Sequence, residues 1–439
     1  MVPQLGDPHT TVPKTQAAGH AFAASPSVSE ERSLHVAWLG PVPTEEGGVA
    51  GVATELLDGL SSIGHRIDCF FTCDERPIPP RLTARPNVTY SWGSTAWRWD
   101  RWYSRNRTAA FISGLLVRAA ASVVVRRQIA THHRRDPYDL VYQFSSIESL
   151  GTSRRFARLV PLVIHPETHS AGELRSLISE RKLARRCDST PRLVLIAAVL
   201  LLRALVQRVY ARRARLLICI SAAFRDHLVR DYGIEQRRTV VVPNPVRLDR
   251  FDPAHRDLPE RPVVLALGRV AVRKGIQDVV GVAQALHNRN SPITVRIVGA
   301  GSLWSDYTAL LSDLPATGAE YAGAVSWADV TAELAGCDVL LAASRYEPFA
   351  LTVAEALASG VPTVGTTAVG AMEQVDGAVA VAVAPGDVDA LVTAVVSTVD
   401  RVRTDPAAVA AAARSEAERL FATETVCAQI SRALLELAC

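Results

Sequence analysis

The sequence has few of the features that mark secreted, metal-binding or membrane-spanning proteins. Its seven cysteines are odd in number and include no C-x-x-C pair, which argues against a disulfide framework and against a zinc site. The longest apolar run, Leu193 to Leu202, has ten residues and is bracketed by Arg192 and Arg203, whereas a membrane span needs about 20. Residues 1–32 lack the apolar core of a secretory signal and show no helical periodicity. We therefore predict a protein of the reducing cytoplasm, with a disordered leader over residues 1–32.

The usual glycine motifs of nucleotide-binding proteins are also missing. Gly47 and Gly48 lie between a strand predicted from Leu34 to Leu39 and a helix predicted from Ala50 to Ile63. Their spacing fits neither the G-x-G-x-x-G fingerprint nor a Walker A loop, which disfavours NAD and ATP as ligands. Adjacent glycines before a helix still allow backbone N–H groups to approach an anion, so Gly48 is a candidate anion-binding residue.

Acidic residues are scarce in the first part of the chain. Residues 1–250 carry 35 Lys and Arg against 22 Asp and Glu, whereas residues 251–439 carry 13 against 22. Residues 173–215 hold eleven of these cations and three acids, and five aromatic residues lie among arginines between Trp92 and Arg107. This balance favours an anionic partner, either a phosphorylated substrate or the inner face of a membrane, and no nucleic-acid signature accompanies it. Alternatively, the basic residues serve only solubility and the docking of the two domains.

Strands and helices alternate along most of the chain, which implies parallel sheets with helices on both faces and ligands beyond the C-terminal strand ends. The segment 247–261 is charged and contains prolines, and we interpret it as a linker. We therefore predict an α/β protein with two doubly wound, Rossmann-like domains facing a central cleft, at 33–246 and 262–412, followed by helices at 413–439. After the first strand, strands are predicted at 67–72, 88–92, 140–144, 162–165, 216–220, 240–242, 263–267, 295–298, 339–342, 361–366 and 378–383.

The stretch from Ala343 to Val364 carries two carboxylates eight residues apart. Glu347 follows a buried strand, and Glu355 falls inside a helix predicted from Ala350 to Ala358. Eight residues of helix rise about 12 Å, whereas the paired carboxylates of a glycosidase lie roughly 5–9 Å apart. Two separate acceptors for hydroxyl groups of one long ligand fit this spacing better, with the helix N-terminus between them suited to a phosphate. Two solvated glutamates without a ligand are the alternative.

A second strand end in the same predicted domain is basic. The strand from Val263 to Leu267 is followed by Gly268 and Arg269, and Lys274 comes five residues later. Glycine permits close approach of the backbone, and the cations would neutralise phosphates. A solvated basic turn would contain the same residues. A further glycine turn, beginning at Gly299, follows the next strand.

The run from Glu347-Pro348-Phe349 to Glu355, and on to Ser359-Gly360-Val361-Pro362, resembles the Glu-x7-Glu signature of retaining glycosyltransferases of family 4, which have the two-domain GT-B fold. The Gly47-Gly48 loop, the cationic loop after Gly268 and the turn at 243–246 are also similar to motifs of this family, so the resemblance spans about residues 33–390. The sequence departs from the family at Ala350 and at Pro245, where glycine is usual.

The resemblance implies a reaction and a role for individual residues. The enzyme would move a glycosyl group from a nucleoside-diphosphate sugar to an acceptor with retention of configuration, without a cofactor or a metal ion, because Arg269 and Lys274 would hold the diphosphate. Glu347 would bind the sugar hydroxyls and Glu355 the ribose, while His165 would lie beside the donor sugar. The predicted catalytic set is His165, Glu347, Arg269 and Lys274, and the further donor-binding residues are Gly48, Gly268, Gly299, Phe349, Ala350, Leu351, Thr352 and Glu355. The final helix is expected to pack back on the N-terminal domain.

Two other functions fit the same residues. One is a protein that binds a nucleotide sugar without chemistry, and the other is a sugar-nucleotide epimerase of the same architecture. A glycosyl phosphorylase is disfavoured because its cofactor-lysine signature is absent. The resemblance leaves the acceptor open between a small molecule and an anionic or lipid-linked one, and leaves the base of the donor open between UDP, GDP and ADP.

Overall fold

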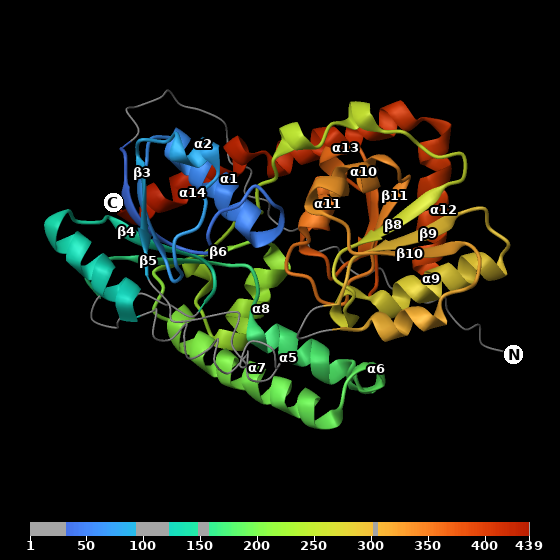
Figure 1. Ribbon diagram of the computed structural model, residues 1–439, viewed down its shortest axis with the longest axis horizontal. Coiled ribbons are helices and arrows are strands. Elements are labelled where there is room, and N and C mark those ends of the chain that lie inside the picture. The colour runs from blue at the N-terminus through green and yellow to red at the C-terminus, as the bar shows by residue number, and fades with distance from the viewer. Residues whose placement is uncertain (1–31, 94–122, 148–157, 302–305, 439) are drawn as a thin grey trace, which may run out of the picture. The chain divides into compact units, whose positions relative to one another are not determined.

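A computed structural model describes residues 32–93, 123–147, 158–301 and 306–438. These residues form two parallel sheets flanked by helices (Figure 1), which confirms the predicted fold class. The leader and most of the Trp- and Arg-rich segment after Trp92 lie outside the described residues.

The first sheet has seven strands in the order β3-β2-β1-β4-β5-β6-β7, and each strand pairs in parallel with its neighbour. Apolar runs build it, and β5 shows this most clearly because all five of its residues are buried. The strands are β1 (His35–Leu39), β2 (Arg66–Phe71), β3 (Val88–Trp92), β4 (Leu140–Ser145), β5 (Leu162–Pro166), β6 (Leu216–Cys219) and β7 (Thr239–Val241). The labelled helices of this half are α1 (Gly48–Ser62), α2 (Pro80–Thr83), α5 (Ser170–Ser179), α6 (Arg181–Cys187), α7 (Thr190–Ala211) and α8 (Ala222–Tyr232).

The second sheet has six parallel strands in the order β10-β9-β8-β11-β12-β13. The order reverses between β8 and β11, and this central position is where a doubly wound sheet binds its ligand. The strands are β8 (Val263–Leu267), β9 (Thr294–Val298), β10 (Ala319–Gly323), β11 (Val339–Ala342), β12 (Thr363–Thr366) and β13 (Ala380–Val383). The helices are α9 (Ile276–Asn288), α10 (Val330–Ala335), α11 (Leu351–Ala358), α12 (Val388–Thr404), α13 (Pro406–Phe421) and α14 (Thr423–Ala438).

Most predicted strands lie within two residues of the observed ones, and the sequence missed one of them. The edge strand β10 has the sequence AEYAG, in which no residue is fully buried, so it carries no apolar run that could have revealed it. The predicted glycine turn at Gly299 leads into residues 302–305, which lie outside the described residues, and a 3₁₀-helix follows at Thr308–Asp313.

The last helix returns to the first sheet. Figure 1 shows the red α14 beside the blue α1, and the Oγ1 hydroxyl of Thr423 donates to Glu55 Oε2 over 2.9 Å. His65 Nε2 lies 2.7 Å from Ser431 Oγ in the same contact. Helix α13, which precedes α14, packs on α11 of the second half. The domain limits predicted from the sequence stay a prediction.

Candidate active site

Two glycines shape the backbone at the C-terminal end of β8 and β9. Gly268 has φ +140° and Gly299 has φ +144°, a region that residues with a side chain rarely adopt. A Cβ atom on Gly299 would lie 1.7 Å from the carbonyl oxygen of Gly268. The two predicted ligand turns therefore touch each other, and only glycine fits at Gly299.

A third glycine places the cations beside β11. Gly275 has φ +72°, and a Cβ atom there would lie 1.8 Å from the carbonyl oxygen of Ala343. This close approach brings the preceding Lys274 to the loop that carries Glu347, 73 positions away in the sequence. Lys274 Nζ lies 2.5 Å from Glu347 Oε2, and Arg273 donates to the same oxygen over 3.1 Å. The structure thus joins the cationic loop and the first glutamate of the Glu-x7-Glu motif.

The charges in this cluster decide the ionisation of Glu347. Burial raises the pKa of Glu347, but the charges of Lys274 and Arg273 outweigh burial and bring its pKa to about 2. Burial also lowers the pKa of Lys274, against the effect of Glu347. Glu347 is therefore a carboxylate at neutral pH, held in place by two cations rather than by solvent.

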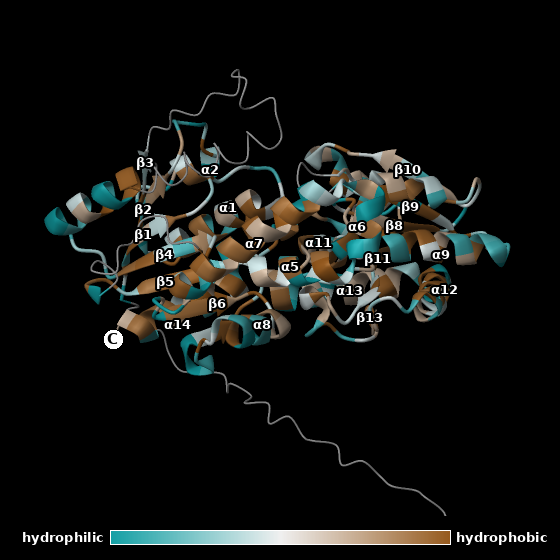
Figure 2. Cartoon of the chain, turned by 90° about the horizontal axis from the view of Figure 1, so that it is seen from below, coloured by the Kyte–Doolittle hydropathy of each residue, from teal (hydrophilic) through white to brown (hydrophobic). Residues whose placement is uncertain are grey.

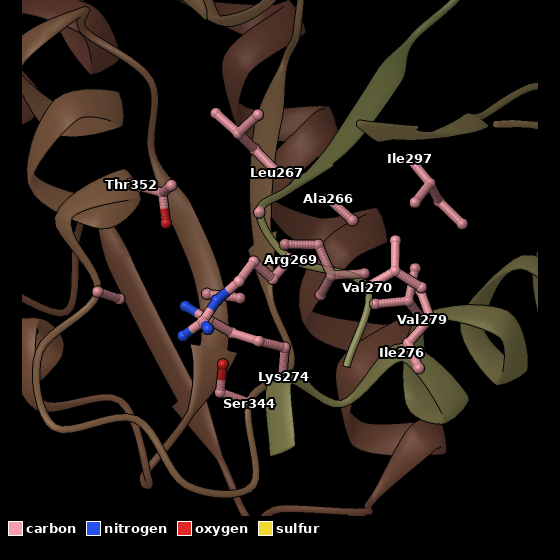
Figure 3. A pocket seen from close by; sticks show the side chains of 14 residues that line it. Ala266, Leu267, Arg269, Val270, Lys274, Ile276, Val279, Ile297, Ser344 and Thr352 are labelled. Atoms are coloured by element: carbon pink, nitrogen blue, oxygen red, sulfur yellow. The ribbon is translucent and has the colours of Figure 1, made fainter. Parts of the chain in front are cut away.

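Arg269 and Lys274 point into one pocket. The Arg269 side chain is exposed, and partial desolvation together with the nearby charge of Arg273 lowers its pKa. Figure 3 shows the nitrogen atoms of Arg269 and Lys274 gathered between the hydroxyl groups of Thr352 and Ser344. The pocket wall also includes Gly268, Ala350 and the apolar side chains of Leu267, Val270, Ile276, Val279, Ile297 and Leu341. A polar ligand with two or more negative charges suits this arrangement.

The N-terminus of α11 faces the same pocket. Leu351 and Thr352 form its first turn, where backbone N–H groups have no partner within the helix. Ala350 precedes them with φ +82°. Glu355, one turn further on, is 8 % exposed, and burial raises its pKa to about 7 in spite of the positive charges of Arg250 and Lys274. A partial positive charge and a buried carboxyl group therefore lie on one short helix.

Phe349 and His165 are both buried, although the sequence predicts that each lies beside the donor. Phe349 is 3 % exposed and packs edge-to-face on Phe421, with ring centroids 5.6 Å apart, so its side chain belongs to the core. His165 has no exposed surface, and its Nδ1 lies 2.7 Å from the hydroxyl of Tyr142. Burial lowers the pKa of His165 to about 3, so the ring is neutral. A catalytic role for His165 stays a prediction.

Comparison with known proteins gives two consecutive family matches. Residues 47–245 match the model described as "Glycosyl transferase 4-like domain", and residues 261–401 match the model described as "Glycosyl transferases group 1". The chain belongs to the group 1 glycosyltransferases.

Curated relatives are about 30 % identical to this chain over the stretches that align. Glycogen synthase of Mycobacterium tuberculosis is 31 % identical over 214 residues, which is 48 % of this chain and 50 % of the relative. Mannosylfructose-phosphate synthase of Agrobacterium fabrum is 31 % identical over 173 residues, 35 % of this chain and 38 % of the relative. 2-Deoxystreptamine glucosyltransferase of Streptomyces kanamyceticus is 30 % identical over 229 residues, 49 % of this chain and 58 % of the relative. The chain spans about half the length of the curated relatives that it matches.

Solved glycosyltransferase structures share the fold over nearly the whole chain. Sucrose-phosphate synthase from Thermosynechococcus elongatus superposes with a TM-score of 0.66 at 17 % identity, covering 92 % of this chain and 99 % of the other. HepE from Anabaena, in complex with UDP and glucose, gives a TM-score of 0.58 at 18 % identity, covering 92 % of this chain and 100 % of the other.

Sequence reasoning missed a buried polar pair in the glycosyltransferase's first half. Glu167 is 9 % exposed, and its Oε2 accepts a hydrogen bond from Asn244 Nδ2 over 2.8 Å. The other oxygen of each side chain is buried without a hydrogen-bond partner. Burial, and to a lesser extent the charge of Glu347, raises the pKa of Glu167 to about 7. A signal was present, because Asn244 lies in the turn at 243–246 and Glu167 comes two residues after His165.

A second missed group ties the Glu347 loop to the first half. His169 lies between two partners: its Nδ1 is 2.6 Å from the hydroxyl of Tyr346, and its Nε2 is 2.7 Å from Asp231 Oδ2. Ser221 Oγ also donates to the carbonyl oxygen of Pro348 over 2.8 Å. The residues on both sides of Glu347 are therefore held by side chains at the starts of α5 and α8, in the first half, which orients the carboxylate.

Gly48 lies at the start of α1 rather than among these charges. Gly48 has φ +73°, and the neighbouring Gly47 packs so closely on Trp327 that a Cβ atom would lie 1.7 Å from its indole nitrogen. Within the described residues, no hydrogen bond links Gly48 to Arg269 or Lys274. Its predicted contact with the donor stays a prediction.

Ala350 holds a backbone conformation that costs free energy for any residue with a Cβ atom. The left-handed region costs such a residue roughly 1–2 kcal/mol, whereas the greater freedom of glycine in the unfolded chain costs about 0.4–1 kcal/mol. We therefore expect Ala350→Gly to raise the free energy of unfolding by up to about 1.5 kcal/mol, as measured by urea unfolding. Ala354→Gly, in the middle of the same helix, is the matched control and should be destabilising. Equal losses in both variants would contradict strain at Ala350.

Proposed function

We propose that this protein transfers a glycosyl group from a nucleoside-diphosphate sugar to a hydroxyl acceptor, with retention of the anomeric configuration. The observation that carries the proposal is the meeting of Arg269, Lys274 and the N-terminus of α11 at one pocket beyond β8 and β11. Such a site offers side-chain cations and backbone N–H groups to a diphosphate, and carboxyl groups on either side of it to hydroxyl groups.

The cations act on the leaving group. When the bond between the anomeric carbon and the phosphate oxygen breaks, negative charge develops on the nucleoside diphosphate. Arg269 and Lys274, with the N–H groups of Leu351 and Thr352, stabilise that charge. Because the charge is greater in the transition state than in the bound donor, these groups increase the rate more than the affinity.

The carboxyl groups orient the two ends of the donor. Glu347, ionised and held by Lys274 and Arg273, accepts hydrogen bonds from the hydroxyl groups of the sugar. Glu355 accepts hydrogen bonds from the ribose. The acceptor oxygen then bonds to the anomeric carbon on the face that the phosphate leaves, and the acceptor proton passes to the departing phosphate oxygen. This last step rests on the resemblance to the retaining family.

The acceptor enters from the half that carries Glu167 and Asn244. Their two unpartnered oxygen atoms are buried, and a hydroxyl group of the acceptor would provide the hydrogen bonds that they lack. A polyhydroxylated acceptor, or an acceptor with a hydroxylated head group, therefore suits this side of the site.

Thermal shift and turnover together test the proposal. UDP and UDP-glucose are the first probes, because they are the ligands of the Anabaena neighbour, with GDP- and ADP-sugars beside them and no added metal. A ligand at 100 times its dissociation constant stabilises by about 2.7 kcal/mol, which raises the melting temperature measurably. Stabilisation followed by release of the nucleoside diphosphate on addition of hydroxyl acceptors supports transfer. Tight binding without turnover would favour the non-catalytic alternative, and a changed sugar on an intact donor would favour the epimerase. If no nucleotide stabilises the protein, the assignment of this pocket to a nucleotide sugar is wrong.

The pKa of Glu355 predicts how donor affinity depends on pH. Hydroxyl groups bond more strongly to a carboxylate than to a carboxylic acid, and binding the donor requires Glu355 to be ionised. We expect the affinity for the nucleoside diphosphate to fall as the pH drops below about 7, by up to about tenfold per pH unit. Calorimetry between pH 5.5 and 8.5 measures this, and Glu355→Gln should weaken binding and remove the pH dependence.

Glu167→Gln is the matched control, because the pKa of Glu167 is also raised to about 7 but the residue lies in the other half. This variant should keep the pH dependence of nucleotide binding. If Glu167→Gln removes it and Glu355→Gln does not, the assignment of Glu355 to the ribose is wrong.

A further inference from the structure

Helix α7 is an apolar helix that the protein leaves largely uncovered. It has 22 residues, and an 18-residue window within it has a mean hydropathy of 2.0 and is only 17 % buried. Figure 1 places α7 at the lower edge, and Figure 2, seen from below, shows it largely brown. Val194 and Leu202 each expose 62 % of their surface. The other exposed large hydrophobic residues of the helix are Leu195, Leu201, Leu205, Val206 and Val209.

These side chains lie on one face. At 100° per residue, Val194, Leu201 and Leu205 fall along one line of the helix and Leu195, Leu202 and Val209 fall along a neighbouring line. The helix is about 33 Å long, so this face forms a continuous apolar stripe over several turns. Soluble proteins rarely leave so long an apolar surface open unless it meets a partner. The ten-residue run noted in the sequence is thus part of a longer surface.

The opposite face anchors α7 to the protein. Ala204, Gln207 and Ala211 are buried. Gln207 Oε1 accepts a hydrogen bond from the backbone N–H of Ser170 over 2.8 Å and another from the hydroxyl of Tyr232 over 2.5 Å. A helix that crossed a bilayer would lose these bonds, so the contacts allow α7 to lie on a membrane but not to span it.

Cations stand at both ends of the apolar face. Arg181, Lys182 and Arg185 on α6 are exposed before its start, and Arg208 and Arg212 are exposed at its end. No acidic residue occurs from Thr190 to Arg215. Two copies of the helix packed face to face, parallel or antiparallel, would bring cations against cations. A lipid surface with anionic head groups can contact both: its acyl chains can cover the apolar stripe, and its head groups can pair with the cations at the two ends.

We propose that α7 lies in the plane of an anionic lipid surface, with its apolar face among the acyl chains and the cations of its two ends on the head groups. The binding follows the pattern of interfacial helices, in which buried apolar area and attraction to anionic lipid act together. This contact does not involve the pocket that holds Arg269 and Lys274, so its test is independent of the proposed transfer reaction.

Vesicle flotation tests the proposal with the full-length protein. We expect binding to vesicles of phosphatidylcholine mixed with phosphatidylglycerol, weakened by high salt, and much weaker binding to phosphatidylcholine alone. The double variant Leu202→Gln/Leu205→Gln, which changes no charge, should weaken binding about 10- to 100-fold. Leu159→Gln is the matched control, because Leu159 is 71 % exposed and lies outside α7, and it should bind as the wild type does.

The other possible occupants of the face give different results. If the wild type fails to bind either vesicle and light scattering shows that the double variant dissociates a dimer, a second copy covers α7 and the proposal is overturned. If the double variant loses its thermal transition, another part of the same chain covers the face, and the proposal is again overturned. Equal binding to both vesicle types would overturn the role of the cations, and Lys182→Gln/Arg185→Gln should reduce binding to the anionic vesicles only.

Discussion

Replacing Arg269 with alanine is expected to lower the rate of glycosyl transfer about 100- to 1,000-fold, with little change in the melting temperature. Arg269 is exposed and lines the pocket, and within the part of the chain that the structure describes it makes no hydrogen bond or ion pair, so the fold does not depend on it. Its function is to stabilise the charge of the leaving diphosphate. Most of the loss should therefore appear in kcat rather than in KM, because the charge is greatest in the transition state.

The matched control for this variant is Arg289→Ala. Arg289 caps the far end of α9 and pairs with Asp389 at the surface, and its side chain is 52 % exposed. Steady-state kinetics with saturating donor should show no change for this control. A rate for Arg269→Ala within a few-fold of the wild type would contradict the assignment of the diphosphate to this loop, whatever the identity of the acceptor.

Replacing Glu347 with glutamine is expected to affect both stability and rate. The variant removes the anion that Lys274 and Arg273 share, and breaking a buried ion pair from one side costs about 3–5 kcal/mol. The loss of a hydrogen bond between a charged group and a sugar hydroxyl should lower the rate about 10- to 100-fold. Urea unfolding and steady-state kinetics measure the two effects.

The dependence of this loss on pH follows from the lowered pKa of Glu347. Because the pKa is about 2 in the folded protein and 4.5 as its ordinary value, the carboxylate contributes stability that is fully present above pH 4.5 and is lost as the pH falls toward 2. The difference in stability between wild type and Glu347→Gln should therefore be largest near neutral pH and should shrink in acid. A nucleoside diphosphate should also stabilise the variant more than the wild type, since it supplies the missing anion. A difference that does not change with pH would show that Glu347 acts through packing alone.

The local order of elements could be predicted because each buried strand is a short apolar run bounded by glycine, proline or charge. Helix α11 was visible in the same way, from strong helix formers that end at Ser359-Gly360. The strand β10 was not, because an edge strand with exposed side chains has no apolar pattern of its own. Glu355 and Glu347 were singled out by their spacing, but the ionisation of each carboxyl group depends on the residues around it in space, which the spacing does not specify.

The sequence by itself determined that two wound sheets form, that charged loops end their central strands, and that an apolar run interrupts the basic first half. Only the tertiary structure decided which distant residues meet. It placed Lys274 on Glu347, joined His169 to Tyr346, and buried Glu167 against Asn244. It also turned the apolar side of α7 outward, because Gln207 and the small residues of the opposite side pack on the protein. The physical reason is that periodicity is a property of neighbours along the chain, whereas contact, burial and the pKa of a carboxyl group depend on neighbours in space.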